Sequence, residues 1–155
     1  MSNVKAHETK HTFTEIVEDP EHEQRSASAE FERNRKQLII TDRHGCFVCE
    51  LLNLPPSPHP LEAHHFLCEW SEWNDADGSK MQRVFDLGVF DFYGYSKKLQ
   101  GCDVKSPDDI RNLVILCMKH HRASGIGIHD TTAPLWFSQS VAKDGIDILE
   151  GSDEV

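Results

Sequence analysis

Two short segments of this chain carry side chains that commonly bind zinc in proteins. Cys46-Phe-Val-Cys49 and Cys117-Met-Lys-His120 each place two ligands on either side of a two-residue spacer. Such a spacer lets both side chains reach one ion from a single turn, and two such pairs supply the four ligands of a tetrahedral Zn²⁺ site. The spacing therefore predicts a closed Cys3His zinc site. Two alternatives stay open: a thiol redox pair at Cys46 and Cys49, and two unrelated turns with buried thiols.

A pair of adjacent histidines, His64 and His65, lies in the segment Leu61–Leu67, which is predicted to be a β-strand. Neighbouring side chains on a strand point to opposite faces of the sheet. The two imidazoles therefore cannot serve one ion in the same way. We interpret one as a metal ligand and the other as a group that acts on a substrate. The simpler alternative is one buried and one exposed histidine with no shared function.

The order of these motifs resembles that of a known enzyme family. The chain carries, in sequence, Cys46-x-x-Cys49, Leu61-Glu-Ala-His-His65, Asn112-Leu113 and Leu116-Cys-x-x-His-His121. This order is similar to that of the zinc-stapled HNH endonucleases, above all the small versions found in bacteriophages and prophages. The segment Gly127–Trp136 is also similar to the Gly-Ile-His and Pro-x-Trp segments of some of those phage proteins. The resemblance covers roughly residues 28–140.

The resemblance implies a small α+β fold. Its centre would be a ββα-metal (His-Me finger) core, in which a two-stranded hairpin and a helix hold one divalent ion. A Cys3His zinc site would staple this core, and an N-terminal helix and irregular segments would flank it. His65 matches the family's general base, and Asn112 matches the asparagine that orients the base or shapes the hairpin loop. The other matches are the catalytic-metal ligands His64 and His121 and the structural zinc ligands Cys46, Cys49, Cys117 and His120.

Three departures from the family pattern affect these assignments. The family's fourth zinc ligand is more often a cysteine, and the adjacent His120 and His121 leave open which of the two binds zinc. The family often has a further histidine four residues after the helix ligand, where this chain has Gly125. His129 follows two glycines and is a candidate for that missing catalytic-metal ligand. Its alternative role is to hold the turn.

Phosphodiester hydrolysis explains why a neutral histidine and a metal ion are needed together. A divalent ion neutralises charge on the phosphate and stabilises the leaving oxygen. A histidine, with a reference pKa of about 6.5, can accept a proton from water near pH 7. We expect its second ring nitrogen to be held by a main-chain carbonyl near Asn112 or by the side-chain oxygen of Asn112. An open site with histidine ligands accepts Mg²⁺, Mn²⁺, Ni²⁺ or Zn²⁺ as the catalytic ion.

Several elements must position these groups. Ser28 is a candidate N-cap, and apolar residues at helical spacing predict a helix from Ala29 to about Asp42. The segments 61–67 and 112–116 are predicted to be strands, and residues 74–80 a turn. Ser106-Pro107-Asp108-Asp109 is typical of a helix start, although the helix has room for only one turn before the second strand.

The charge distribution divides the chain into three parts. The 155 residues have a formal net charge of −10 at pH 7, which makes the whole chain a poor partner for nucleic acid or an anionic membrane. Residues 1–24 and 144–155 hold eleven of the 26 acidic residues, and we interpret them as an acidic N-terminal arm and an acidic C-terminal tail. Residues 25–143, the expected nuclease domain, have a net charge of −1.

The sequence also bears on where the protein acts. The N-terminus carries no apolar signal region, and no stretch approaches the ~20 apolar residues of a membrane span. We therefore expect no membrane partner and a cytoplasmic location, which would be the host cytoplasm for a phage-encoded protein. In a reducing compartment cysteines are more often metal-bound or buried than paired in disulfides. Cys68 and Cys102 lack spaced partners and are predicted to be buried.

DNA is the expected substrate, and three basic residues are candidate phosphate contacts. Lys119 and Arg122 flank the proposed metal-binding helix, and Arg111 precedes the central asparagine. The alternative for each is an ordinary solvated charge. We recognise no array of base-reading side chains, so we expect low sequence specificity, or specificity supplied by a partner such as a phage packaging or replication protein.

Three functions follow from these features. The leading hypothesis is a metal-dependent HNH endonuclease that hydrolyses phosphodiester bonds in DNA, by nicking or double-strand cleavage, and is associated with a phage. The second is a catalytically inactive zinc-binding module that interacts with nucleic acid or a protein partner. The acidic ends and the missing second helix histidine favour it. The third, a thiol redox protein, leaves the histidine pair and Asn112 unexplained.

Overall fold

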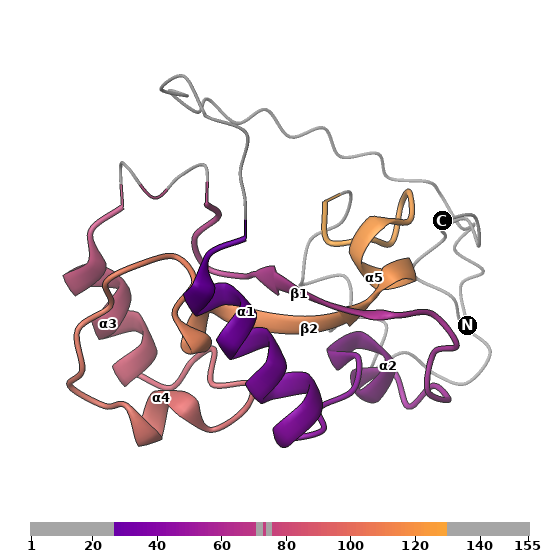
Figure 1. The fold of residues 1–155 in the computed structure, drawn as a ribbon, viewed down its shortest axis with the longest axis horizontal. Helices are drawn as coiled ribbons and strands as arrows, with labels where there is room; N and C mark the ends of the chain where they lie inside the picture. Colours follow the sequence, from indigo (N-terminus) through magenta and orange to yellow (C-terminus); the bar gives the residue numbers. More distant parts are fainter. Residues whose placement is uncertain (1–26, 71–72, 74–75, 130–155) are drawn as a thin grey trace, which may run out of the picture.

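The computed structural model describes residues 27–70, 73 and 76–129, a range that excludes the acidic arm and tail. Its elements are α1 (Ala29–Lys36), η1 (Gln37–Thr41), α2 (Phe47–Leu51), β1 (Leu61–His65), α3 (Gly78–Asp86), α4 (Tyr95–Lys98), η3 (Ile110–Asn112), β2 (Leu113–Cys117) and α5 (Met118–Arg122). Of these, η1 is π-helical and η3 is a 3-10 helix. The described chain is a small α+β fold around a two-stranded sheet (Figure 1), as predicted. Within it, no helix has the length and apolar character needed to cross a bilayer.

The N-terminal helix begins where the sequence predicts. Ser28 Oγ accepts a hydrogen bond of 2.9 Å from the main-chain N–H of Phe31 and so caps α1. Glu30 and Glu32 occupy the first turn, where acidic side chains complement the helix dipole. Helical backbone continues through η1 to Thr41. The predicted extent is therefore confirmed, but the change to π-helical hydrogen bonding is a feature that the sequence does not indicate.

β1 and β2 pair antiparallel, with Leu61 opposite Cys117 and His65 opposite Leu113. Both predicted strands are confirmed with shifted ends. β1 stops at His65, and β2 begins at Leu113 because Asn112 belongs to η3. Residues 66–112 connect the two strands, so their register is not set by a tight turn. All five residues of β2 are buried, as a strand covered on both faces requires.

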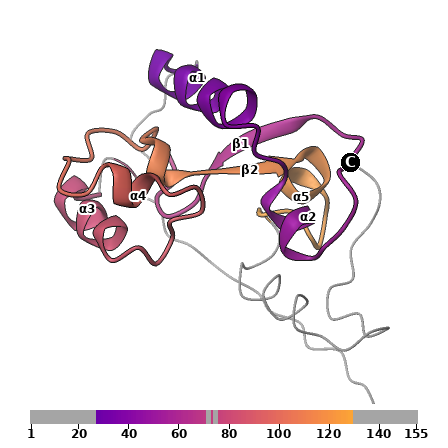
Figure 2. The ribbon, with the colours of Figure 1, turned by 90° about the horizontal axis from the view of Figure 1, so that it is seen from below.

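Helices cover both faces of this sheet. α1 and η1 lie on one face, and α2 and α5 lie on the other (Figures 1 and 2). Along β2, Leu113 and Ile115 belong to the core beneath α1 and η1, whereas Val114 and Leu116 belong to the core beneath α2. Residues that are neighbours along either strand therefore lie in different environments. This alternation places the two adjacent histidines, His64 and His65, on opposite faces of the sheet.

The connection between the strands contains a helix that the sequence does not predict. α3 begins at Gly78, within the stretch 74–80 that is predicted to be a turn. Asp77 caps it by accepting hydrogen bonds from the main-chain N–H groups of Ser79 and Lys80. Met81 and Phe85 pack into a third apolar cluster, which also includes Cys68 and Val104. α3 and α4 lie together at the end of the sheet away from α2 and α5 (Figure 1).

The predicted helix start at residues 106–109 leads into a single turn. The N-cap of η3 is Asp109, whose Oδ1 accepts a 3.0 Å hydrogen bond from the main-chain N–H of Arg111. Because Asp109 performs the capping, the carboxylate of Asp108 is available for another partner. It points toward β1 and contacts His65.

Candidate metal sites and active site

A buried cluster of three cysteines and one histidine joins α2, β2 and α5. Cys46 and Cys49 come from the start of α2, Cys117 ends β2, and His120 lies on α5. The three sulfur atoms lie 3.3, 3.5 and 3.3 Å from Nδ1 of His120. A tetrahedral zinc site with bonds of about 2.3 Å to sulfur and 2.0 Å to nitrogen has sulfur–nitrogen separations of about 3.5 Å. The cluster therefore fits a structural metal such as zinc, held by the ligands that the spacing predicts.

Neighbouring thiols and burial shift the pKa values of the three cysteines in this cluster. The hydrogen bond between Cys46 and Cys117 raises the pKa of the Cys46 thiol and lowers that of Cys117, and burial raises the pKa of Cys49. A bound ion displaces the remaining thiol protons, so its affinity falls as the pH is lowered. Of the other two cysteines, Cys68 is buried as predicted, whereas Cys102 is exposed, contrary to the prediction.

A second cluster consists of His64, His121 and His129, whose candidate ligand atoms lie within 4.8 Å of one another. The ring centroid of His64 lies 4.8 Å from that of His121 and 4.7 Å from that of His129. His64 is buried, His121 is half-buried and His129 is exposed, so the cluster opens toward the surface. A buried Cys3His cluster is typical of a structural ion, whereas an open set of three histidines is typical of an exchangeable or catalytic one.

Two histidines of the second cluster, His64 and His121, are in the protonation state that metal binding requires. Burial, with smaller contributions from the nearby rings of His121 and His129, lowers the pKa of His64 to about 3. Burial also lowers the pKa of His121, against the opposing effect of Glu62. The Nδ1–H of His64 donates to the main-chain carbonyl of His65, which places the lone pair of the ring on Nε2. His64 and His121 are thus neutral near pH 7.

Glu62 is an orienting residue that the sequence analysis missed. It lies two residues before His64, on the same face of β1, and its Oε2 accepts a 2.6 Å hydrogen bond from Nδ1 of His121. Carboxylates in this position fix the tautomer and orientation of metal-ligating histidines. Glu62 also accepts hydrogen bonds from Arg122. A second carboxylate borders the cluster, since Oε1 of Glu69 lies 3.4 Å from Nε2 of His64.

A tight return of the chain after α5 brings His129 to this cluster. The main-chain N–H of Gly127 donates to the carbonyl of Ala123 at 2.7 Å, and that of Ile128 donates to the carbonyl of His120 at 3.0 Å. A Cβ at position 127 would lie only 2.7 Å from the Ala123 oxygen, so this approach requires glycine. Of the two roles left open for His129, its position beside His64 favours the ligand role. The rest of the similar segment, residues 130–136, lies outside the described residues.

His65 occupies the opposite face of β1. Its Nε2 lies 2.8 Å from Oδ1 of Asp108, and its ring centroid lies 5.7 Å from that of Phe31 on α1. His65 and Asp108 are 4% and 5% exposed. The partner of Nε2 is thus neither of the groups expected near Asn112. It is an aspartate from the segment predicted to start a helix.

Asn112 is fully buried and fixes the loop that follows β1. Its Oδ1 accepts hydrogen bonds from the main-chain N–H groups of Leu67 and Cys68, at 2.9 and 3.2 Å. Its Nδ2 donates to the carbonyls of Cys68 and Pro107, at 2.8 and 2.7 Å. All four hydrogen-bonding positions of the amide are used. Of the two roles that the resemblance implies, these contacts correspond to shaping the hairpin loop.

The three predicted phosphate contacts differ in accessibility. The side chain of Arg111 is 0% exposed and donates to the carboxylate of Asp109 and to main-chain carbonyls. Its predicted contact with phosphate is therefore wrong, because the buried guanidinium is hydrogen-bonded to groups within the connection between β1 and β2. Arg122 is 58% exposed at its side chain but is paired with Glu62. Lys119 is partly exposed on the same helix.

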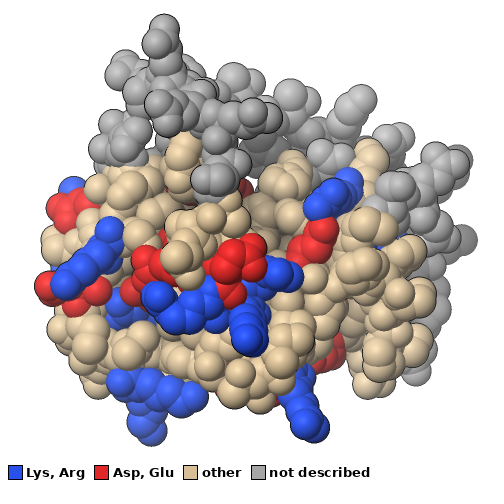
Figure 3. All heavy atoms as spheres, viewed as in Figure 1, with Lys and Arg blue, Asp and Glu red and all other residues tan. Residues whose placement is uncertain are grey.

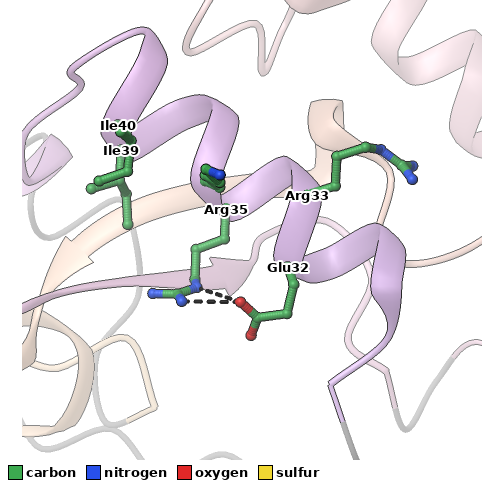
Figure 4. A pocket seen from close by; sticks show the side chains of 6 residues that line it. Glu32, Arg33, Arg35, Ile39 and Ile40 are labelled. Atoms are coloured by element: carbon green, nitrogen blue, oxygen red, sulfur yellow. Dashed lines mark hydrogen bonds and ion pairs between the residues drawn. The ribbon is translucent and has the colours of Figure 1, made fainter.

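The face that carries α1 presents acidic and basic side chains close together rather than a continuous basic surface of described residues (Figure 3). A groove of about 550 Å³ follows α1 and η1 (Figure 4) and is lined by Glu32, Arg33, Arg35, Lys36, Ile39 and Ile40. Within it, Arg35 and Glu32 form a 3.0 Å ion pair. The groove follows α1 and η1, on the opposite face of the sheet from α5, which carries His121 (Figure 2), so its cations are not placed to hold a phosphate at the histidine cluster.

Comparison with models of known protein families, with curated proteins and with solved structures finds no match. The resemblance to HNH endonucleases thus rests on the order of the motifs along the chain. Three features stand independently of any relative: the Cys3His cluster, the open cluster of three histidines, and the pair of His65 with Asp108.

Proposed function

We propose that this protein is a metal-dependent endonuclease of the HNH type that hydrolyses phosphodiester bonds in DNA. The observation that carries the proposal is the arrangement of β1. This strand directs His64 into an open cluster of three histidines and holds His65 beside a carboxylate. The ring centroids of His64 and His65 are 6.4 Å apart, so a candidate ion site and a candidate base lie next to each other.

In this proposal β1, β2 and α5 form a ββα-metal core that the Cys3His cluster ties together. His64, His121 and His129 would hold the catalytic ion, and their nitrogen donors fit Mn²⁺, Ni²⁺ or Zn²⁺ as well as Mg²⁺. When bound, the ion supplies charge neutralisation at the phosphate and stabilisation of the leaving oxygen. His65 accepts a proton from the attacking water. Asn112 keeps the loop after β1 in place.

DNA binding by this chain alone would be weak and sensitive to salt. The formal net charge is −10, and the buried side chain of Arg111 cannot contact a phosphate. Lys119 and Arg122 on α5 lie beside the histidine cluster and are the remaining candidates for phosphate contacts. A partner, such as a phage packaging or replication protein, would deliver the substrate, because few cations mean few released counterions and a low affinity.

Plasmid cleavage tests this proposal. The wild-type protein is incubated with supercoiled DNA and Mg²⁺, Mn²⁺, Ni²⁺ or Zn²⁺, beside the variants His65→Ala and His59→Ala. Loss of a positioned general base lowers the rate by about 100-fold or more. His59, in the loop before β1, serves as a matched control and retains wild-type activity. Equal cleavage by folded His65→Ala and wild type would rule out the proposed base.

A zinc-binding module without cleavage activity is the second candidate, and the 4% exposure of His65 favours it. Metal counting separates the two. The nuclease holds one tightly bound zinc ion plus a second, exchangeable ion at the three histidines, whereas the module holds only the first. Elemental analysis before and after dialysis against a weak chelator distinguishes these stoichiometries.

A further inference from the structure

We propose that Asp108 is a positioning residue for His65 and that α1 holds it in that role. This inference rests on the proposed function, in which His65 is the general base. It adds a part that the motif order does not contain, because Asp108 and α1 lie outside β1, β2 and α5. It also assigns a purpose to a buried carboxylate that neither metal cluster uses.

Each oxygen of the Asp108 carboxylate has its own partner. Oδ1 lies 2.8 Å from Nε2 of His65, and Oδ2 accepts a 2.6 Å hydrogen bond from Oγ of Ser28. A carboxylate accepts hydrogen bonds and does not donate them, so the neutral imidazole carries its proton on Nε2. The basic lone pair of His65 is then on Nδ1. Asp108 thereby decides which ring nitrogen can accept a proton from water.

Residues of α1 and its cap fix the position of Asp108. Ser28, which contacts the carboxylate, is also the N-cap of the helix. Nδ2 of Asn34 donates to the main-chain carbonyl of Asp108 at 2.8 Å. Ser106 accepts from the main-chain N–H of Asp108 at 3.2 Å and donates to Glu30 at 2.7 Å. The helix therefore holds the segment before η3 at three points, and a turn of the carboxylate away from His65 would break its hydrogen bond with Ser28.

The depth of this pair makes its geometry consequential. His65 and Asp108 are 4% and 5% exposed, and a buried carboxylate is tolerated only where hydrogen bonds replace its water. Water has little access to this carboxylate and therefore does not compete strongly with it for the hydrogen bond from the His65 imidazole. The orientation of His65 therefore depends on Asp108, and through Asp108 on Ser28. A role confined to stability would leave the chemistry of His65 unaffected, and this difference is measurable.

Cleavage kinetics provide the first test, with Asp108→Asn, the matched control Asp103→Asn and wild type. Asp103 is exposed and lies in the same connection. Asp108→Asn keeps the size of the side chain but removes its charge. We expect kcat to fall by about 100-fold with KM within twofold of wild type, because substrate binding does not involve this residue. Asp103→Asn keeps both constants.

A double variant separates positioning from stability. If Asp108 acts through His65, Asp108→Asn has no further effect on kcat in a His65→Ala background. An equal loss in both backgrounds, or no loss in either, would overturn the proposal. If Asp108→Asn fails to fold, as judged by circular dichroism and zinc content, Ser28→Ala replaces it in the cycle. That variant removes both the contact to Oδ2 and the N-cap of α1 but leaves the Asp108 carboxylate in place, with an expected loss of about tenfold that Ser28→Thr restores.

Nuclear magnetic resonance tests the same contact without relying on cleavage. Long-range ¹H–¹⁵N correlations identify which nitrogen of His65 carries the proton in the neutral ring. We expect Nε2–H in wild type, with a proton resonance shifted downfield that moves upfield in Asp108→Asn. A proton on Nδ1 in wild type would overturn the proposal whether or not the protein cleaves DNA. The expected tautomer in a protein that cleaves no DNA would instead reject the proposed function and leave the contact between Asp108 and His65 standing.

Discussion

Glu62 on β1 and His121 on α5 share a 2.6 Å hydrogen bond that ties the last described helix to the sheet. The bond fixes the Nδ1 proton of His121 and leaves the lone pair of Nε2 as the group that can bind an ion. The ring centroids of His121 and His129 are 5.2 Å apart. One carboxylate on the strand therefore orients one corner of the histidine cluster.

Replacing Glu62 tests whether this cluster binds an ion. In Glu62→Gln, the neutral amide is a weaker acceptor and can present either end to His121. We expect affinity for the second ion to fall about 10- to 100-fold, while the zinc content stays unchanged. Titration with Mn²⁺, followed by electron paramagnetic resonance, gives the affinity. Glu32→Gln, on the exposed surface of α1, is the matched control. Unchanged Mn²⁺ affinity in Glu62→Gln would contradict the assignment.

The Cys3His cluster is predicted to contribute much of the stability of the domain. We expect Cys46→Ser and Cys117→Ser to lose the bound zinc and unfold the sheet, because structural zinc sites contribute about 10–16 kcal/mol in isolated zinc-finger peptides. Zinc content and circular dichroism measure both effects. Cys102→Ser, at an exposed cysteine outside the cluster, should change neither. Strong chelators should reproduce the unfolding in wild type. A chelated protein with an unchanged melting temperature would show that the cluster is not a structural metal site.

Asn112→Ala is expected to lower the free energy of unfolding by about 3 kcal/mol or more. The substitution leaves two main-chain N–H groups and two carbonyls of a buried loop without their partner, and each unpaired buried group costs about 1–3 kcal/mol unless water replaces it. Urea denaturation of wild type and variant measures the difference. A small loss of stability accompanied by loss of cleavage would indicate a direct role for Asn112 in the chemistry instead.

The hydrogen bond between Tyr95 and Asp42 predicts a dependence of stability on pH. Oη of Tyr95 donates to Oδ2 of Asp42 at 2.7 Å, which joins α4 to the end of η1 and lowers the pKa of Asp42. A lowered carboxyl pKa contributes stability that is fully present above the unfolded value of about 3.9 and is lost as the pH falls through the folded value. We expect Tyr95→Phe to lose about 1 kcal/mol at neutral pH.

The difference between Tyr95→Phe and wild type should stay constant from about pH 5 to 8 and shrink below about pH 4. Denaturation curves of both proteins across this range provide the measurement. Growth of the difference in acid would mean that the bond stabilises the protonated carboxyl, contrary to the direction of the pKa shift.

Local patterns in the sequence were sufficient for part of this site. The two-residue spacers that follow Cys46 and Cys117 already allow both ligands of each pair to reach one ion from a single turn. The cap at Ser28 is likewise a local contact, with a residue three positions later. The alternation of a strand likewise separates His64 from His65 without reference to the rest of the fold. Such features depend on neighbours along the chain, and the structure reproduces them.

The contacts that orient the two sites were beyond sequence reasoning. Asp108 and His65 are 43 positions apart, and Glu62 and His121 are 59 positions apart, so neither pair forms a local pattern. Arg111 is the opposite case, because the sequence predicts a phosphate contact that the fold does not allow. An arginine beside a candidate active-site residue is indistinguishable in sequence from a phosphate contact, and its burial follows only from how the connection packs around it.

The long connection between β1 and β2 does not by itself fix the register in which the two strands pair. A slip by one residue would exchange the faces of His64 and His65, and so would exchange the proposed ion ligand with the proposed base. Cys117, opposite Leu61, anchors one end of the ladder through the Cys3His cluster, and Asn112 clamps the other through the loop after His65. A structural ion at this cluster would therefore fix the register of the two strands, and with it the faces of the sheet that His64 and His65 occupy.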